Sequence, residues 1–389
     1  MAAAEPAGMV SERARATSPF LAMDVLEKAN AMDDVVHLEV GEPDFEPPEY
    51  VVDAAVEAMR SGDTGYTAAG GKPALRRAIA DYYDRTYGVD IAPERVFVTP
   101  GSSPGLLLAC LAVLDPADEA LLTDPHYACY PNFVRQTGAQ IGTVPLDPAD
   151  GFTPRFDAFA RALEREPEML LLNSPANPTG SVLEGDTLAE LVDLAAPETT
   201  VVADEIYHGL DYETEAHSVL EYTDDAFVTD GLSKRFGMTG WRLGWVVVPE
   251  GYVDAATRLA QNLFICAPSF VQDAARVAVE RGDDHVERVR ERFRERRDYL
   301  LDAVEQWGLG LDYTPGGAYY LLIDVSDLPG DAFDAADLFL EEAGVALTPG
   351  PDFGPGAEQY LRVSYANSRE NLERAHERIS DLLASAPDA

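Results

Sequence analysis

The stretch VFVTPGSSPGLLLACLAVL (96–114) decides the fold, because it reads as a strand, a turn and a buried helix in direct succession. The same alternation continues downstream, where short apolar runs typical of strands recur in EALLTD (119–124), MLLLNSP (169–175), TVVADE (200–205), AFVTDG (226–231) and LGWVVVP (243–249). Helical patterns lie between them at 127–138 and near 184–195. Apolar strands that alternate with helices predict an α/β fold with a mostly parallel sheet covered by helices on both faces.

The chain changes character after residue 251, where a smaller α+β unit is predicted. Its helical patterns fall at 251–264, 269–280, 283–306, 332–343 and 368–384, and its strand-like runs at 318–325, 345–348 and 360–365. The N-terminal 40 residues are expected to pack with this unit. We therefore predict a large domain over 41–280 and a small domain formed by 1–40 with 281–389.

The chain is strongly acidic. Its 389 residues include 29 basic and 69 acidic side chains, for a formal net charge of −40, and the acid is spread along the whole length. Such a surface repels phosphate backbones and anionic lipid headgroups, which argues against nucleic-acid and membrane partners. Because salt screens the repulsion between acidic side chains, the composition predicts a halophilic protein of a very salty cytosol. An acidic binding surface is the alternative.

Other features favour a cytoplasmic protein. The longest apolar run, residues 105–114, is too short to span a bilayer, and the first 20 residues show no signal-peptide pattern. Cys110, Cys129 and Cys266 are odd in number and far apart, which predicts free thiols in a reducing compartment. His126 and Cys129 stand three apart, but without a second such pair in the sequence no metal site is expected.

Lysine is scarce in this sequence, with only Lys28, Lys72 and Lys234 against 26 arginines. Lys234 follows a predicted strand and precedes a loop that contains glycine. A lysine amine in such a place can form a Schiff base. The alternative is a surface lysine beside Arg235. Because lysine has been nearly eliminated elsewhere, we favour the catalytic interpretation.

An anion site is predicted after the first strand. Gly101, Ser102 and Ser103 open a helix, whose N-terminal N–H groups and hydroxyls can bind an anion. Arg242, eight residues after Lys234, suits a phosphate ester. The alternative for the serines is a simple N-cap of the helix.

Three further polar residues are candidates for ligand binding. Asp204 ends a strand, where its carboxylate can hydrogen-bond a pyridinium nitrogen, although a helix cap or a surface acid is the alternative. Asn177 lies in an Asn-Pro-Thr-Gly turn, and by itself marks only a turn. Arg362 lies on a predicted strand, which makes an anionic ligand plausible.

Six segments in order resemble one family. They are LEVGEPDF (38–45), GYTAAGGKPALRRAIADY (65–82), NSPANPTG (173–180), DEIY (204–207), SKRFGMTGWR (233–242) and RVSYANS (362–368). They resemble the hallmarks of class I/II pyridoxal-phosphate (PLP) aminotransferases, which are fold type I and aspartate-aminotransferase-like. The resemblance covers nearly the whole chain.

The resemblance implies a role for each matching residue. Lys234 is similar to the Schiff-base lysine, Asp204 to the partner of the pyridine nitrogen and Tyr207 to the group beside the ring 3-oxygen, and these are the expected catalytic residues. Further cofactor contacts are implied at Asn177, at Tyr127, which would stack on the ring, and at the phosphate-binding residues Gly101, Ser102, Ser103, Ser233 and Arg242. Substrate contacts are implied at Arg362, which would bind the α-carboxylate, and at Gly41 and Asn177. Tyr66 resembles a tyrosine that reaches the phosphate in a neighbouring subunit, which implies a homodimer with shared sites.

Two departures from the family pattern bear on the substrate. Gly231 stands where many members carry serine, and Ser103 stands where some dicarboxylate-specific members carry lysine. Arg13 or Arg15 could bind a second carboxylate, but we favour a salt-bridged surface arm. Donors with neutral side chains, such as alanine or an aromatic or aliphatic amino acid, are therefore expected to match or exceed aspartate.

The expected activity is that of an amino-acid:2-oxo-acid aminotransferase, with 2-oxoglutarate as acceptor. On the same fold, the alternative is a PLP-dependent lyase, racemase or decarboxylase. From another class, the alternative is a non-catalytic small-molecule-binding protein, against which the retention of Lys234 argues.

The acidic surface generates a prediction about salt. We expect dialysis below roughly 0.1 M salt, where the Debye length reaches ~10 Å, to inactivate the protein and dissociate its dimer through self-repulsion. Activity and light-scattering mass across a salt series measure both effects. Full stability in dilute buffer would contradict the halophilic interpretation.

Overall fold

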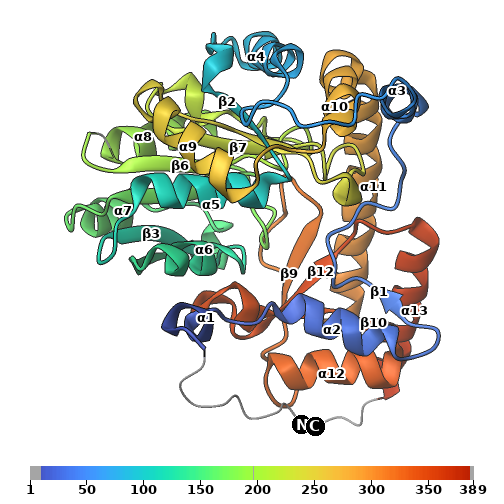
Figure 1. Ribbon diagram of the computed structural model, residues 1–389. Coiled ribbons are helices and arrows are strands. Elements are labelled where there is room, and N and C mark those ends of the chain that lie inside the picture. The colour runs from blue at the N-terminus through green and yellow to red at the C-terminus, as the bar shows by residue number, and fades with distance from the viewer. Residues whose placement is uncertain (1–9, 196, 386–389) are drawn as a thin grey trace.

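The computed structural model describes residues 10–195 and 197–385 and contains a seven-stranded sheet and a smaller three-stranded sheet (Figure 1). The large sheet has the order β2-β8-β7-β6-β5-β3-β4. Its strands are β2 (Val96–Thr99), β3 (Glu119–Asp124), β4 (Gln140–Pro145), β5 (Met169–Asn173), β6 (Thr200–Asp204), β7 (Phe227–Gly231) and β8 (Gly244–Val247). Only β8 runs antiparallel to its neighbours. The predicted mostly parallel α/β sheet is thus confirmed.

Both faces of the large sheet are buried. Along β5, Leu170 and Leu172 pack into the core on one face, and Met169 and Leu171 pack into the core on the other. One core is shared with α3 (Glu49–Arg60), α4 (Pro73–Tyr87), α7 (Phe156–Leu163), α8 (Gly185–Ala195) and α10 (Ser269–Arg281). The other is shared with α5 (Ser102–Val113), α6 (Tyr130–Thr137) and α9 (Val253–Leu263). This double burial explains the near-continuous apolar strands of the sequence.

One strand of the large sheet was not predicted. β4 lies at the sheet edge and pairs only with β3. Its residues, QIGTVP, mix polar and apolar types and contain no apolar run. Three of its six residues are exposed and one is buried. Because so little of the strand is buried, its sequence shows no regular pattern of apolar residues. An edge strand pairs with a single neighbouring strand and is more exposed than a central strand, so fewer of its residues have to be apolar.

The smaller sheet is antiparallel, with β12 (Tyr360–Ser364) between β11 (Thr348–Pro349) and β9 (Tyr320–Asp324). It shares a separate core with α11 (Asp283–Trp307), α12 (Ala332–Ala343) and α13 (Arg369–Ser385). β1 (Val36–His37) pairs with β10 (Val345–Ala346), and α2 (Leu21–Asn30) packs against α12. Residues of α2 and β1 therefore contact the C-terminal part, whereas α1 (Glu12–Ala16) contacts α6 beside the large sheet. The division at residues 40 and 280 stays a prediction.

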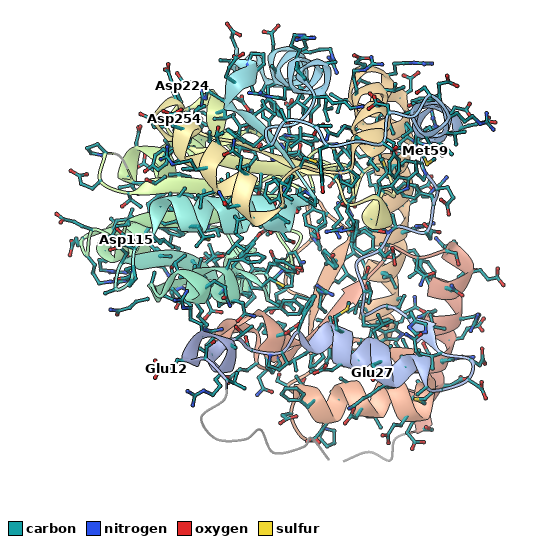
Figure 2. The ribbon with its side chains drawn as sticks, in the orientation of Figure 1. Glu12, Glu27, Met59, Asp115, Asp224 and Asp254 are labelled. Carbon is teal, nitrogen blue, oxygen red and sulfur yellow. The ribbon has the colours of Figure 1, made fainter. Side chains whose placement is uncertain are left out.

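The acidic residues are distributed over the molecule. Figure 2 shows Glu12, Glu27, Asp115, Asp224 and Asp254 at the periphery, on elements of both lobes. No helix of the described chain has both the length and the apolarity that crossing a bilayer requires. These labelled acidic side chains therefore come from several separate parts of the molecule.

Candidate active site

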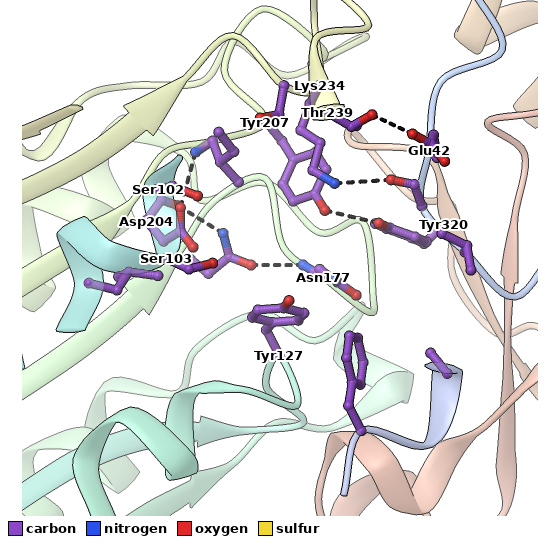
Figure 3. Close-up of a pocket in the computed structure, with 18 of the residues that line it drawn as sticks. Glu42, Ser102, Ser103, Tyr127, Asn177, Asp204, Tyr207, Lys234, Thr239 and Tyr320 are labelled. Carbon is purple, nitrogen blue, oxygen red and sulfur yellow. Dashed lines mark hydrogen bonds between the residues drawn. The ribbon is translucent and has the colours of Figure 1, made fainter. Parts of the chain in front are cut away.

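A pocket of about 470 Å³ opens at the C-terminal ends of β5, β6 and β7, between the two sheets (Figure 3). Its walls come from strand ends of the large sheet, from β9 and β12 of the small sheet, and from the N-terminal segment around Phe20 and Gly41. Parallel strands end at the same sheet edge, and this is where open α/β sheets bind their ligands.

Asp204, the last residue of β6, is a buried carboxylate at the base of this pocket. It accepts hydrogen bonds from the Tyr130 hydroxyl at 2.8 Å and from the Ile206 N–H at 3.2 Å. Within the described part of the chain, no basic side chain forms an ion pair with it. Burial raises the pKa of Asp204 to about 6, although these hydrogen bonds oppose the rise. The site therefore lacks the positive charge that would stabilise this carboxylate.

Lys234 lies in the turn after β7, and its Nζ donates a hydrogen bond to the Gly41 carbonyl at 3.0 Å (Figure 3). The turn is anchored from behind, because Arg235 forms a buried ion pair with Asp230 at 2.8 Å. Arg235 also donates to the His208 carbonyl. The consecutive residues Lys234 and Arg235 thus point in opposite directions, and the lysine amine lies inside the pocket.

An anion cradle forms where α5 begins. Gly101 has a φ of 95°, and a Cβ on it would lie 2.5 Å from an Nη atom of Arg242, so only glycine fits there. The Arg242 side chain donates to the Thr239 and Pro100 carbonyls. Ser102, Ser103 and Ser233 line the pocket beside it. Helix N–H groups, hydroxyls and a guanidinium at one point favour a phosphate-like group.

Gly231 is explained by its neighbours. A Cβ at this position would lie 3.0 Å from the Gly244 Cα and 3.1 Å from the Leu243 carbonyl oxygen. The adjacent strand β8 therefore leaves little room for the serine that the family pattern carries there.

Arg362 brings the positive charge of the small sheet into the pocket. Its side chain is buried, and it donates to the Asn177 Oδ1 at 3.0 Å and to the Glu39 carbonyl. Its Nε is buried with no partner among the described residues. A guanidinium with a free N–H group, aimed by two hydrogen bonds, can bind a carboxylate.

The structure brings most of the predicted site residues together. Those that line the pocket are Gly41, Ser102, Ser103, Tyr127, Asn177, Asp204, Tyr207, Ser233, Lys234, Arg242 and Arg362. Gly101 lies directly behind Arg242. Tyr66 does not line the pocket and is 86% exposed. Arg13, on α1 (Glu12–Ala16), donates to the Gln136 carbonyl, and neither Arg13 nor Arg15 lines the pocket.

Several pocket residues were missed by sequence reasoning. Tyr320 bonds the Tyr207 hydroxyl, Tyr130 bonds Asp204, and Asn173 accepts the Asn177 N–H. Phe20 and Met23 also line the pocket, as do Glu42 and Thr239, which are hydrogen-bonded to each other. The one indication in the sequence was their closeness to predicted site residues, since Tyr130 lies three residues after Tyr127 and Asn173 lies four residues before Asn177.

Comparison with known proteins relates this geometry to one family. A sequence profile described as aminotransferase class I and II matches residues 33–379. A (5-formylfuran-3-yl)methyl phosphate transaminase of Methanocaldococcus jannaschii is 36% identical over 96% of this chain and 100% of its own length. An aspartate/prephenate aminotransferase of Thermus thermophilus is 37% identical over 97% and 99%. The solved structure of the Thermus thermophilus aspartate aminotransferase with maleate superimposes with a TM-score of 0.92 at 36% identity, over 96% of this chain and 99% of that one.

The unpaired Asp204 generates a prediction about stability. Because burial moves its pKa from 3.8 to about 6, the native state favours the protonated carboxyl, and the contribution of Asp204 to stability is lost as the pH rises through this window. Asp204→Asn removes the buried charge. In urea unfolding of the ligand-free protein we expect a gain of about 3 kcal/mol above roughly pH 7 and almost none below about pH 4.

Asp230→Asn is the matched control. This carboxylate is equally buried but paired with Arg235, so its loss should destabilise the protein at neutral pH by about 3–5 kcal/mol. A pH-independent effect of Asp204→Asn would show that charge burial is not its cause.

Proposed function

The chain belongs to the aminotransferase class I and II family, and from this premise we propose which residues carry its reaction and which substrates it takes. It is a PLP-dependent transaminase that moves an amino group between an amino acid and a 2-oxo acid. We infer that the donor has a neutral side chain and that 2-oxoglutarate is the acceptor. The observation that supports the residue assignments is the meeting of Lys234, Asp204 and Arg362 in one pocket.

The residues present fit PLP. The unpaired, buried Asp204 carboxylate suits a protonated pyridine nitrogen, which would supply the missing positive charge. The Gly101–Ser103 turn, Ser233 and Arg242 suit the phosphate. Tyr207 and Asn177 suit the ring oxygen, and Tyr127 suits the ring face. When bound, PLP supplies an electron sink for bond cleavage at the substrate α-carbon.

Lys234 is the group that moves the proton. Its amine reaches the Gly41 carbonyl, at the side of the pocket where Tyr207 and Tyr320 also lie (Figure 3). A free amine held there can take a proton from the α-carbon and return it one position away, as a general acid–base. The Arg235–Asp230 ion pair keeps the turn in place during this transfer.

Arg362 orients the substrate. Its guanidinium, fixed by Asn177 and Glu39, can bind the α-carboxylate that every amino acid and 2-oxo acid carries. This binding places the α-carbon toward the lysine side of the pocket. The fixed geometry lowers the entropic cost of reaching the reactive arrangement.

Donor selectivity follows from the charges that line the pocket. Among the described residues, its only lysine or arginine side chains are Lys234, Arg242 and Arg362, and each already has a role. The rest of the wall includes the apolar Phe20 and Met23 and the acidic Glu42. Arg13 and Arg15, for which a surface position is favoured, both lie outside the pocket in this structure. The two relatives bear names of different substrates, so the pocket itself is the better guide.

We also propose a cytoplasmic, halophilic homodimer. Tyr66 is exposed on its own subunit, and the apolar side chains of Leu263 and Ile265 are 43% and 52% exposed. A second subunit would cover such groups and bring Tyr66 to the neighbouring phosphate site. The net charge of −40 supports a salty compartment.

The lysine assignment is tested by trapping. Borohydride reduction of the purified yellow protein should fix the cofactor on Lys234, as peptide mass mapping will reveal. Lys234→Ala should lower kcat at least about a thousandfold, because it removes both the covalent link and the general acid–base. Lys28→Ala and Lys72→Ala are the controls, since these lysines pair with surface acids. Trapping at either control position would overturn the assignment.

Donor choice is tested by kcat/KM for alanine, leucine, phenylalanine and aspartate with 2-oxoglutarate in molar KCl. Neutral donors should match or exceed aspartate, because a second buried carboxylate without a cation costs several kcal/mol. Met23→Arg should raise kcat/KM for aspartate by about tenfold, and Met23→Gln should not. A hundredfold preference of the wild type for aspartate that disappears in Arg13→Ala/Arg15→Ala would contradict this proposal.

A further inference from the structure

Tyr320 lies where the two halves of the pocket meet. It is the first residue of β9, it is 1% exposed, and its side chain lines the pocket wall. In the antiparallel pairing with β12, Tyr320 is opposite Ser364, and Leu322 is opposite Arg362. Tyr320 and Arg362 are therefore diagonal neighbours on the same face of the small sheet.

The ring of Tyr320 contacts the guanidinium of Arg362. The Arg362 Cζ lies 4.5 Å from the ring centroid, within the range of a cation–π interaction. Asn177 and Glu39 hold two of the guanidinium nitrogens by hydrogen bonds. The Phe353 ring contacts the same guanidinium, with its centroid 4.8 Å from the Arg362 Cζ. The two rings together oppose tilting of the guanidinium plane, a restraint that hydrogen bonds to single nitrogens do not supply.

The hydroxyl of Tyr320 serves a different neighbour. It lies 2.9 Å from the Tyr207 hydroxyl, and both side chains are buried (Figure 3). Burial keeps the pKa of Tyr207 well above its usual range, so this hydroxyl retains its proton. When Tyr320 donates to Tyr207, the Tyr207 proton is left to point elsewhere in the pocket. In that arrangement the Tyr207 hydroxyl can donate to another acceptor in the pocket.

Gly41 makes room for this arrangement. A Cβ on Gly41 would lie 1.8 Å from the Tyr320 hydroxyl oxygen, so any side chain there would displace the tyrosine. The Gly41 carbonyl also accepts the hydrogen bond from Lys234. The backbone that meets the lysine is therefore packed directly against Tyr320.

We propose that Tyr320 is a positioning residue for transamination, whose ring fixes the carboxylate-binding guanidinium of Arg362 and whose hydroxyl directs the Tyr207 hydroxyl toward the cofactor ring. The inference rests on the roles given above to Arg362 and Tyr207. It assigns two separable tasks to two parts of one side chain.

Two substitutions separate these tasks. Tyr320→Phe keeps the ring and removes the hydroxyl, whereas Tyr320→Leu removes both. If near-ultraviolet circular dichroism shows that Tyr320→Leu is unfolded, Tyr320→Met takes its place. Tyr365→Phe is the matched control, because it removes a similar hydroxyl–hydroxyl contact, with Tyr212 at 3.3 Å, outside the pocket.

Two readouts on the holoenzyme are needed besides turnover. The first is the pH titration of the visible absorbance, which reports the proton on the lysine–cofactor link. The second is the Kd of 3-phenylpropionate, a probe with a single carboxylate, obtained from the same absorbance. We expect Tyr320→Phe to move the titration midpoint upward by at least about half a pH unit, because the Tyr207 hydroxyl would then be a weaker hydrogen-bond donor to the ring oxygen of the cofactor. The Kd of 3-phenylpropionate should stay within about threefold of wild type. Tyr320→Leu should in addition weaken 3-phenylpropionate binding about tenfold.

Arg362→Lys is measured in parallel to separate two failures. If it weakens probe binding while Tyr320→Leu or Tyr320→Met binds as well as wild type, the role of the ring is overturned and that of Arg362 stands. If Arg362→Lys leaves binding unchanged, the assigned role of Arg362 fails, and the role of the Tyr320 ring fails with it. An unmoved absorbance titration in Tyr320→Phe, or an equal shift in Tyr365→Phe, would overturn the role of the hydroxyl.

Discussion

Asp204 places a carboxylate in a buried strand end that offers it hydroxyl and amide donors but no cation from the described residues. Burial raises its pKa, because the charged form is disfavoured away from water. A protonated ring nitrogen would reverse that balance, because each group would then stabilise the charge of the other. In the proposed arrangement, the bound cofactor would therefore offset the cost of burying this carboxylate. The burial of β6 between two apolar cores stabilises the strand and so offsets the free-energy cost of the buried carboxylate.

The rest of the site is arranged around this carboxylate by the topology of the large sheet. β6 and β7 are parallel neighbours, so Asp204 and the turn that holds Lys234 emerge at the same edge. β8 returns antiparallel beside β7 and brings Arg242 back to the start of α5. The small sheet completes the pocket, because Ser364 N–H bonds the Leu38 carbonyl and so ties the Gly41 segment to β12. Arg362, which is proposed to bind the substrate carboxylate, therefore belongs to the small sheet, whereas Asp204, which is proposed to bind the cofactor ring, belongs to the large one. Their spacing depends on how the two sheets meet.

The sequence allowed most of the fold and most of this site to be predicted, for identifiable reasons. Central strands are buried on both faces and so appear as apolar runs, whereas edge strand β4 has no such pattern. Lys234 stood out because lysine is rare, and Asp204 and Arg362 were candidates as polar groups at a strand end or on a strand, whereas Asn177 was selected only through the family resemblance. Tyr320 could not be found this way, since a tyrosine within the apolar run AYYLLIDV is indistinguishable from an ordinary core residue. The arginines of the N-terminal arm show the opposite limit, because the presence of a charge does not reveal where its side chain points.

The surface charge and the pocket charge have opposite signs, and solvent salt determines which of them a substrate experiences. Amino acids and 2-oxo acids must approach a molecule of net charge −40, yet the pocket proposed to bind them is lined by Lys234, Arg242 and Arg362. At 0.01 M salt the Debye length is ~30 Å, so the repulsion of the entire surface reaches an incoming oxo acid. At molar salt it falls to ~3 Å, and only the groups that line the pocket act on the ligand. High salt therefore removes a barrier to anionic substrates while leaving the contacts with buried Arg362 almost unscreened. Arg362, the buried cation of the pocket, is suited to such a surface, because a carboxylate held against it would be shielded from the long-range field around the protein.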